Sequence, residues 1–521
     1  MTSVKKPFAV RRRTLLTGAA ATAGLSLAGG FRPSQAQAAK TLRAGITGYN
    51  VINTLDPGKA SLIPEFYVLW GIFNGLVKFD AKMNVIPDLA ESFKVADDGS
   101  LEIKLRAGVK FQDGSNCTTD DVKFTLERLL DEKFASPNRS KVSAINKIDI
   151  VDPLTIRLST KEAFAPLLTF LANARTGTQI LPRAAVTAAQ GDDFGKRPIG
   201  TGGYMLKEWR PGEKLTLSAF NGYFGGAPKI GTIELPLIAE ESSGVTALLG
   251  GQIDLTSTAP FADIAALSTN AQVRVQKQPG LNTRFIQINT RKAPFDDPAF
   301  RRAISMAFDR EALVKAVLFG EGAALSGLIP PSLDYAHGGK RALCTFDPAR
   351  AKAELAKSRY PNGAEGVILT WAQSWWKRSA EVFVAMVNQT LGTKLTLEVT
   401  DANAVFTRIR AGDYQASIWG WLGFIDADEY TYDIIHTKGW RNFGGYSNPK
   451  VDALLEQGRR EINRDKRGVI YKEAEVAMLE DMPVIPLFCN NVHNLSTPKV
   501  RGFQQLPYSN YGDQFAGMDI G

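Results

Sequence analysis

Histidine and cysteine are scarce in this sequence, with only three of each among 521 residues. The histidines are far apart, at His337, His436 and His493. No HExxH pair occurs, so a histidine-based metal centre or catalytic base is not expected. The cysteines are Cys117, Cys344 and Cys489. They lack CxxC spacing, which argues against the common zinc and redox motifs, and their odd number leaves at least one thiol unpaired.

Motifs for phosphate binding and nucleophilic catalysis are also missing. No GxxxxGK phosphate loop is present, and residues 39–521 contain no GxSxG elbow. The glycine-rich segment at residues 200–203 lacks GxGxxG spacing and is interpreted as a turn. We therefore expect a binding protein rather than an enzyme, with no catalytic residues, no cofactor and no metal.

Positive charge is concentrated at one end of the chain. The formal net charge is +9, but residues 1–38 hold six basic residues and no acidic one. The remaining chain carries 56 basic and 53 acidic side chains, so its balance is close to neutral. A nucleic-acid-binding protein keeps a basic patch in its folded body, and a nucleic-acid partner is therefore not expected.

Residues 1–38 are typical of a cleaved export signal. Basic residues precede an apolar stretch from Leu15 to Phe31, and Ala36-Gln37-Ala38 fits a small-x-small cleavage site. The stretch is 17 residues long, below the ~20 that a membrane-spanning helix needs, which disfavours the alternative of a permanent anchor. Arg12-Arg13-Thr14-Leu15-Leu16 resembles a twin-arginine signal, so a periplasmic location is expected.

Strand and helix patterns alternate through the rest of the chain, which predicts an α/β fold. The first segments are a strand at residues 41–46, an apolar helix-like run from Phe66 to Phe79, a strand at 101–105, and a strand from Gly108 closing at Asp113-Gly114. Thr118-x-x-Asp121 has the spacing of a helix-capping box. Later segments are strands at 367–371, 395–399, 415–421 and 482–488, with helices at about 378–391, 451–455 and 471–479.

Several ordered motifs together identify a family resemblance. They include residues 87–93 (PDLAESF), 105–114 (LRAGVKFQDG), 120–124 (DDVKF), 198–202 (PIGTG), 294–297 (PFDD), 301–305 (RRAIS) and 446–452 (YSNPKVD). In this order they resemble the extracytoplasmic solute-binding proteins, family 5, which serve dipeptide, oligopeptide and nickel ABC importers. The resemblance covers essentially all of the mature chain.

The resemblance implies a two-lobed clamshell in which the first lobe carries an extra subdomain. Lobe I is expected to take residues 39–288 and 485–521, with the extra subdomain at about 81–199, and lobe II to take residues 289–484. It implies a monomer that captures a peptide or peptide-like solute and delivers it to the membrane permease subunits of an ABC importer.

Candidate ligand residues follow the strand ends, because open α/β sheets bind ligands beyond the carboxyl ends of their strands. Aromatic walls suit a pocket that accepts varied side chains. These candidates are Tyr49, Asn50, Trp371, Trp375, Trp376, Trp419, Trp421, Phe424, Asp426, Arg441 and Asn442. The alternative for the tryptophans is the hydrophobic core, and for Arg441 it is a solvated surface charge rather than a carboxylate anchor.

One of these positions departs from the pattern of the peptide-binding relatives. Where those proteins place an aspartate against the α-ammonium of the peptide, this sequence has Phe424, and Asp426 follows two residues later. A buried ammonium opposite Phe424 would lose its counter-charge. The alternatives are therefore that Asp426 takes over this role, or that the ligand is a non-peptide solute such as an opine or a sugar. Nickel is disfavoured by the scarcity of histidine, and an enzyme on the same clamshell is the remaining alternative.

Replacing Arg12 and Arg13 together by lysine is expected to reduce export strongly, because the twin-arginine spacing before Leu15-Leu16 is the motif that this route recognises. The measurement is the amount of mature protein in the periplasm, compared with a variant in which Lys5 and Lys6 become arginine. Undiminished export of the double lysine variant would assign the leader to the general secretory route.

Overall fold

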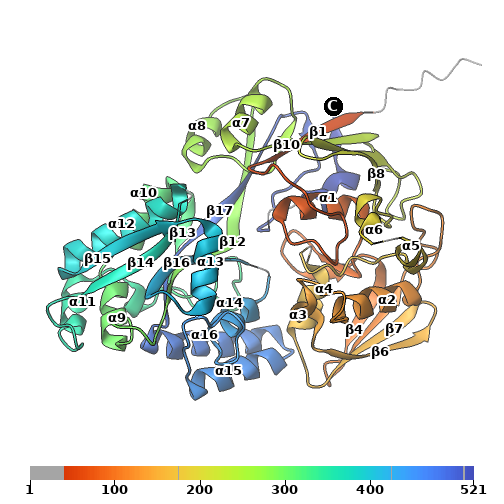
Figure 1. The fold of residues 1–521 in the computed structure, drawn as a ribbon. Coiled ribbons are helices and arrows are strands. Elements are labelled where there is room, and N and C mark those ends of the chain that lie inside the picture. Colours follow the sequence, from red (N-terminus) through yellow and green to blue (C-terminus); the bar gives the residue numbers. More distant parts are fainter. Residues whose placement is uncertain (1–39, 174, 190, 373, 424, 509–510) are drawn as a thin grey trace, which may run out of the picture. The chain divides into compact units, whose positions relative to one another are not determined.

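Two long strands, β12 (Arg274–Ile288) and β17 (Val484–Ser496), pair antiparallel in the middle of the largest sheet. The computed structural model describes residues 40–521, apart from residues 174, 190, 373, 424 and 509–510. Figure 1 shows β12 and β17 running between two bodies of mixed helix and strand. We refer to residues 289–484 as lobe II and to the other described residues as lobe I, following the predicted boundaries.

The eleven-stranded sheet continues from this pair into both lobes, in the order β15-β14-β16-β12-β17-β11-β1-β10-β9-β8, with β13 paired to β17. Its strands in lobe I are β1 (Thr41–Thr47), β8 (Tyr204–Arg210), β9 (Lys214–Ala219), β10 (Thr232–Ile238) and β11 (Leu255–Thr256). Those in lobe II are β13 (Gly322–Ala324), β14 (Glu365–Trp371), β15 (Lys394–Thr400) and β16 (Ala416–Leu422). This mixed α/β architecture confirms the predicted fold class.

Helices surround the lobe II strands. They are α9 (Pro298–Met306), α10 (Arg310–Leu318), α11 (Pro348–Leu355), α12 (Ser374–Leu391), α13 (Ala402–Ala411), α14 (Ala427–Ile435), α15 (Pro449–Arg460) and α16 (Arg464–Asp481). Strands β15 and β16 both run parallel to β14. Their carboxyl ends therefore share one edge of the sheet, and α12, α13 and α14 begin just beyond it.

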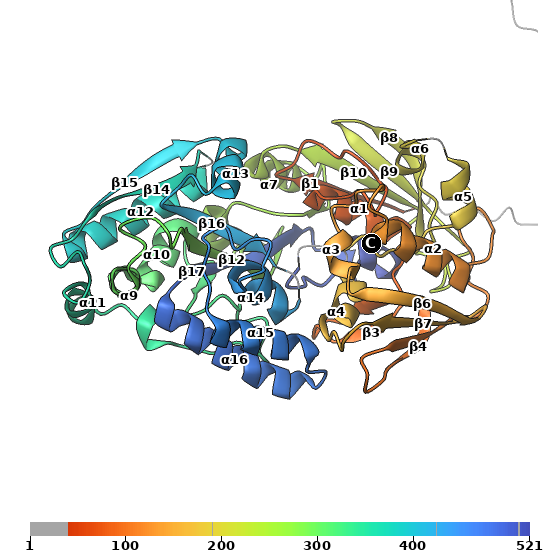
Figure 2. The ribbon, with the colours of Figure 1, turned by 60° about the horizontal axis from the view of Figure 1, so that its bottom comes forward.

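The predicted subdomain holds a separate four-stranded sheet in the order β4-β5-β7-β6, seen at the right of Figure 2. Its elements are β4 (Ala90–Val95), β5 (Leu101–Leu105), β6 (Ile145–Asp152), β7 (Thr155–Thr160), α2 (Thr119–Leu130), α3 (Arg139–Val142), α4 (Pro166–Ala172), α5 (Arg183–Ala188) and α6 (Asp193–Lys196). The capping box at the start of α2 is confirmed, with the N–H of Thr118 donating to the carboxylate of Asp121 at 2.9 Å.

Lobe I is completed by shorter elements around β1. They are α1 (Ile63–Ile72), β2 (Val77–Phe79), β3 (Val85–Pro87), α7 (Glu241–Leu249), α8 (Ile264–Leu267), β18 (Val500–Arg501), β19 (Asp519–Ile520) and the 3₁₀ turns at 261–263 and 512–517. One further 3₁₀ turn, at 342–344, belongs to lobe II. Within the described part of the chain, no helix combines the length and apolar character needed to cross a bilayer.

Three sequence-based boundaries need correction. The apolar run from Phe66 to Phe79 is not one helix: α1 ends before Phe73, whose backbone is extended, and β2 follows. An all-apolar run gives no periodicity that could mark this break. The expected strand at residues 108–114 is reduced to an isolated bridge between Lys110 and Asn116 around the turn. The last strand begins at Val484, because Met482 caps α16 in the left-handed region with φ of 46°.

All three cysteines lie in the described part of the chain and are free, buried thiols. Burial raises the pKa of each of them, that of Cys489 to about 12. The protein therefore keeps these side chains as small apolar core groups rather than as reactive thiolates.

Candidate functional site

The ends of β14 and β16 bring the predicted tryptophans together. Trp371, the last residue of β14, stacks on Trp376 of α12 with ring centroids 4.4 Å apart, and Trp376 lies 4.6 Å from Trp375. Trp371 also meets the edge of Trp419 on β16 at 5.8 Å. Trp371 and Trp375 are half-buried, whereas Trp376 is buried. Four of the five tryptophan candidates thus form one cluster, in which Trp371 and Trp375 keep accessible surface.

Trp419 and Trp421 are two residues apart on β16 and therefore face the same side of the sheet. Trp419 is 3% exposed and packs against Phe406 at 4.9 Å and Phe443 at 6.4 Å. It belongs to the hydrophobic core of lobe II, as the core alternative predicts for this residue. Trp421 is 5% exposed and belongs to the same core cluster, and the charged groups of Arg441 and Lys141 lie near its ring.

Arg441 lies in the loop after α14, with its guanidinium carbon 4.0 Å from the ring centroid of Trp421 and 4.1 Å from that of Trp440. Such stacking of a cation on aromatic faces is favourable. Burial lowers the pKa of Arg441 to about 10, against the opposing effect of Asp433. The expectation of a freely solvated surface charge does not describe this side chain, which is half-buried between two indoles.

The amide of Asn442 has partners inside its own loop. Its Nδ2 donates to the carbonyl oxygens of His436 and Tyr446, and its Oδ1 accepts from the backbone N–H of Tyr446. Asn442 therefore shapes the loop that presents Arg441, which is a structural role that the sequence does not reveal.

A buried ion pair engages Asp426, the residue expected to replace the missing aspartate at Phe424. Its carboxylate accepts from Arg467 of α16 at 2.6 and 2.7 Å and from the backbone N–H of Asp428, which caps α14. Asp426 is 1% exposed. The structure therefore gives this carboxylate a cationic partner within the chain. Phe424 itself lies outside the described residues.

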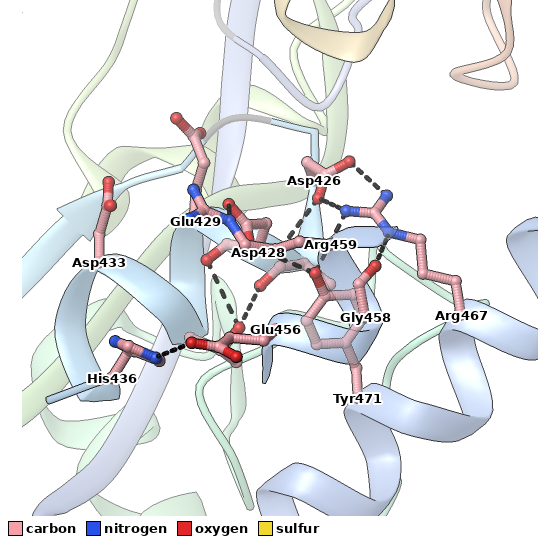
Figure 3. A network of polar contacts seen from close by, with 12 residues as sticks. Asp426, Asp428, Glu429, Asp433, His436, Glu456, Gly458, Arg459, Arg467 and Tyr471 are labelled. Carbon is pink, nitrogen blue, oxygen red and sulfur yellow. Dashed lines mark hydrogen bonds and ion pairs between the residues drawn. The ribbon is translucent and has the colours of Figure 1, made fainter. Parts of the chain in front are cut away.

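Helix α14 carries three acidic residues, and Asp426 at its N-cap is a fourth; Figure 3 shows these acids together with Arg459 of α15 and Arg467 of α16. Arg459 of α15 pairs with Asp428 at 2.9 Å, and Tyr471 of α16 donates to the same carboxylate at 3.3 Å. Burial raises the pKa of Asp428 to about 6, against the effect of Arg459. The remaining acids, Glu429 and Asp433, point toward lobe I.

Lys141 of α3 crosses from the subdomain of lobe I to meet these acids. Its ammonium pairs with Oε1 of Glu429 and lies 3.6 Å from Asp433, in a site where both partners of the first pair are buried. Lys141 also lies 5.7 Å from the ring centroid of Trp421. Burial raises the pKa of Glu429 to about 8, although the ammonium acts in the opposite direction. Oε2 of Glu429 has no hydrogen-bond partner among the described residues.

Two further contacts join the lobes nearby. The backbone N–H of Ala165 donates to the carbonyl oxygen of Arg459 at 2.9 Å, and Arg460 lies 3.4 Å from Glu162. The lobe contact is thus polar and centred on α14.

On the lobe I side, Tyr49 and Asn50 follow β1. Tyr49 is half-buried against the core of lobe I, and Asn50 is exposed. Burial raises the pKa of Tyr49, and the charge of Arg175 opposes this effect. Tyr49 and Arg175 therefore lie within electrostatic range of each other.

Sequence reasoning missed Lys141, Arg175, Arg284 and Glu429. The guanidinium carbon of Arg284 on β12 lies 4.8 and 4.6 Å from the ring centroids of Trp375 and Trp376. Arg284 also lies beside Gly420, where an added Cβ would be 2.7 Å from the Cδ of Arg284. A usable signal existed for Arg175, because it is the only charged residue in residues 163–182. Lys141 and Glu429 lie among other charged residues, and no local pattern distinguishes them.

Comparisons with known proteins agree with this architecture. Residues 84–442 match the model of a family described as bacterial extracellular solute-binding proteins, family 5. A glutathione-binding protein, GsiB, of Escherichia coli strain 536 is 28% identical over 95% of this chain and 98% of its own. The structure of AgaA from A. tumefaciens R10, in complex with agropinic acid, is 27% identical with a TM-score of 0.77, covering 92% of this chain and 99% of its own. The structure of MoaA from the same source, in complex with mannopinic acid, is 26% identical with a TM-score of 0.77. It covers 93% of this chain and 100% of its own.

Substituting Asp426→Asn is expected to lower the free energy of unfolding by about 3–5 kcal/mol, because it leaves the buried guanidinium of Arg467 without a counter-charge. The measurement is denaturant unfolding of the mature protein. The matched control is Asp334→Asn, which breaks a pair that Arg464 makes at 3.2 Å between exposed side chains and is worth at most about 1 kcal/mol. Equal stability of the two variants, with solute binding lost only in Asp426→Asn, would instead assign Asp426 to the ligand.

Proposed function

Because the chain belongs to the bacterial extracellular solute-binding proteins of family 5, we propose that it captures a peptide-like or opine-like small solute between its two lobes. It then delivers this solute to the permease subunits of an ABC importer. The protein works as a monomer in the periplasm, reached through the twin-arginine-like leader of residues 1–38, and does not bind nucleic acid.

The observation that carries this proposal is the lobe contact around α14. Lobe I contributes Lys141 and lobe II contributes Glu429, Asp433 and the stacked pair of Trp421 and Arg441. Ligand sites occur preferentially at interfaces between domains, where aromatic surface is combined with a few polar groups. The relatives support small solutes of two kinds, since one is named for glutathione and two were solved with opines.

The proposed ligand site uses Tyr49 and Asn50 from lobe I and Trp371, Trp375, Trp421 and Arg441 from lobe II. Trp376 and Trp419 support these residues from the core, and Asn442 holds the loop of Arg441. Asp426 stabilises the start of α14. An enzymatic function has no comparable support, since the relatives are binding proteins.

Binding of the solute is expected to reduce the radius of gyration. The chain passes between the lobes along two paired strands, β12 and β17, and these can bend together as a hinge. The measurement is small-angle scattering of the mature protein with and without the solute that native mass spectrometry finds in protein purified from its own periplasm. A solute of the same charge that calorimetry shows not to bind is the control. A bound solute that leaves the radius of gyration unchanged would contradict closure of the lobes.

An N-acetylated or otherwise amine-free analogue is expected to bind within about tenfold of its parent solute. The acids at the start of α14 already have cationic partners in this chain, Asp426 in Arg467 and Glu429 in Lys141. Calorimetry of the two compounds gives the ratio. A loss on the order of 2–5 kcal/mol would mean that a carboxylate of the protein holds the amine, and that the ligand is a peptide with a free N-terminus.

A further inference from the structure

Two aromatic rings and two carboxylates surround the ammonium of Lys141. Its Nζ lies 5.2 Å from the ring centroid of Phe170 in lobe I and 5.7 Å from that of Trp421 in lobe II. It pairs with Oε1 of Glu429 and lies 3.6 Å from Oδ2 of Asp433. Proteins bind the ammonium groups of ligands with the same two elements, aromatic faces and carboxylates. The lobe contact is therefore built as an ammonium site, and a side chain of the protein itself occupies it.

Lobe I fixes the backbone that presents Lys141. The side chains of Ser136 and Asn138, just before α3, are buried and donate to the carbonyl oxygens of Gly58 and Ala60 at 2.6 and 3.1 Å. These bonds tie the start of α3 to the segment that precedes α1. The stem of Lys141 is buried as well, since only 9% of its side chain is exposed. Lys141 thus reaches the other lobe from an anchored backbone.

Lobe II holds the acidic side of this site. The hydroxyl of Tyr430, next to Glu429 on α14, donates to the carbonyl oxygen of Leu281 on β12 at 2.6 Å. Glu429 is 1% exposed, and its Oε2 is buried without a hydrogen-bond partner among the described residues. Without the ammonium of Lys141, this carboxylate would lose its ion-pair partner, which is strongly destabilising in a desolvated site.

The ammonium site adjoins the proposed ligand residues of lobe II. Arg441 stacks on the same indole, with its guanidinium carbon 4.0 Å from the ring centroid of Trp421. The backbone N–H of Arg441 donates to the carbonyl oxygen of Asp433 at 2.9 Å. Because Lys141 and Glu429 come from opposite lobes, parting of the lobes gives a solute access to the acids, and closure returns the ammonium to them. The amine of a solute would therefore compete with Lys141 for the same carboxylates.

We propose that Lys141 determines the specificity of the site, because it takes the place of a ligand ammonium between Glu429 and Asp433, so that the protein selects solutes whose amine is absent or blocked. This inference rests on the proposed function and adds the class of solute. A free amine in this place would meet a second cation, and displacing Lys141 would leave a buried ammonium without a carboxylate. An acylated or lactam nitrogen carries no charge and avoids both penalties. Like charges set against the wrong ligand are an established source of specificity.

The test compares solutes that differ at the amine. The pairs are glutathione with N-acetylglutathione, and mannopinic acid with its lactam, agropinic acid. Calorimetry of mature protein, freed of co-purified solute by unfolding and refolding, gives the ratio of the two Kd values in each pair. In wild type we expect at least one amine-free compound to bind, and to bind at least as tightly as its amine partner.

Lys141→Met removes the ammonium and keeps a long side chain. We expect it to shift the ratio by about 30-fold or more toward the amine compound, because Glu429 and Asp433 then need a cation from outside the chain. Lys141→Arg keeps the charge and should keep the wild-type preference. The matched control is Lys147→Met, since Lys147 lies on β6 with 67% of its side chain exposed, and it should leave the ratio unchanged. Thermal unfolding is the second readout: the amine compound is expected to raise the melting temperature of Lys141→Met more than its amine-free partner does.

The double variant Lys141→Met/Glu429→Gln separates a specificity role from a structural one. It exchanges both members of the buried pair for uncharged side chains, so it is expected to fold and to lose the gain for amines. An unchanged ratio in Lys141→Met, a gain that persists in the double variant, or tighter binding of the amine compound by wild type would show that this inference is wrong while the proposed function stands. If no compound binds any form, the inference is wrong; if in addition native mass spectrometry finds no solute in the protein as purified, the proposed function fails too.

Discussion

The antiparallel pairing of β12 with β17 is the constraint on which the rest of the structure depends. These strands carry the chain into lobe II and back, so the sheet of each lobe is built outward from them. Their register shifts between Pro279 and Thr283 and again between Arg284 and Phe285, where the ladder is irregular. A bulge of this kind leaves a residue unpaired and bends the strand locally.

Local rules predicted much of the fold because the signals were short-range. The alternation at Leu101–Leu105 and the capping box of Thr118 and Asp121 each depend on a few neighbouring residues, and both are confirmed. The run from Phe66 to Phe79 failed because a fully buried segment is apolar whether it is helix or strand. Periodicity appears only where one side of an element meets water.

The candidate site was less accessible to sequence reasoning, because its charges are paired through long-range contacts. Asp426 looked available for a ligand, yet its partner Arg467 is 41 residues away and Lys141 is 288 residues from Glu429. The pattern of strand ends predicted the aromatic candidates, but only the fold shows that Trp419 and Trp421 are both buried and that Arg441 stacks on Trp421. The lone charge of Arg175 in an uncharged stretch was a local signal.

The contact of Lys141 with Glu429 also affects how the empty protein behaves. For the lobes to part, both buried groups must regain water, and their attraction must then act across an aqueous gap. In that gap dissolved ions screen the attraction over about 10 Å at 0.1 M salt, whereas the buried contact is screened far less. Ionic strength therefore acts mainly on the parted form. It thereby changes the free-energy difference between joined and parted lobes, and with it how readily the protein reopens for its next solute.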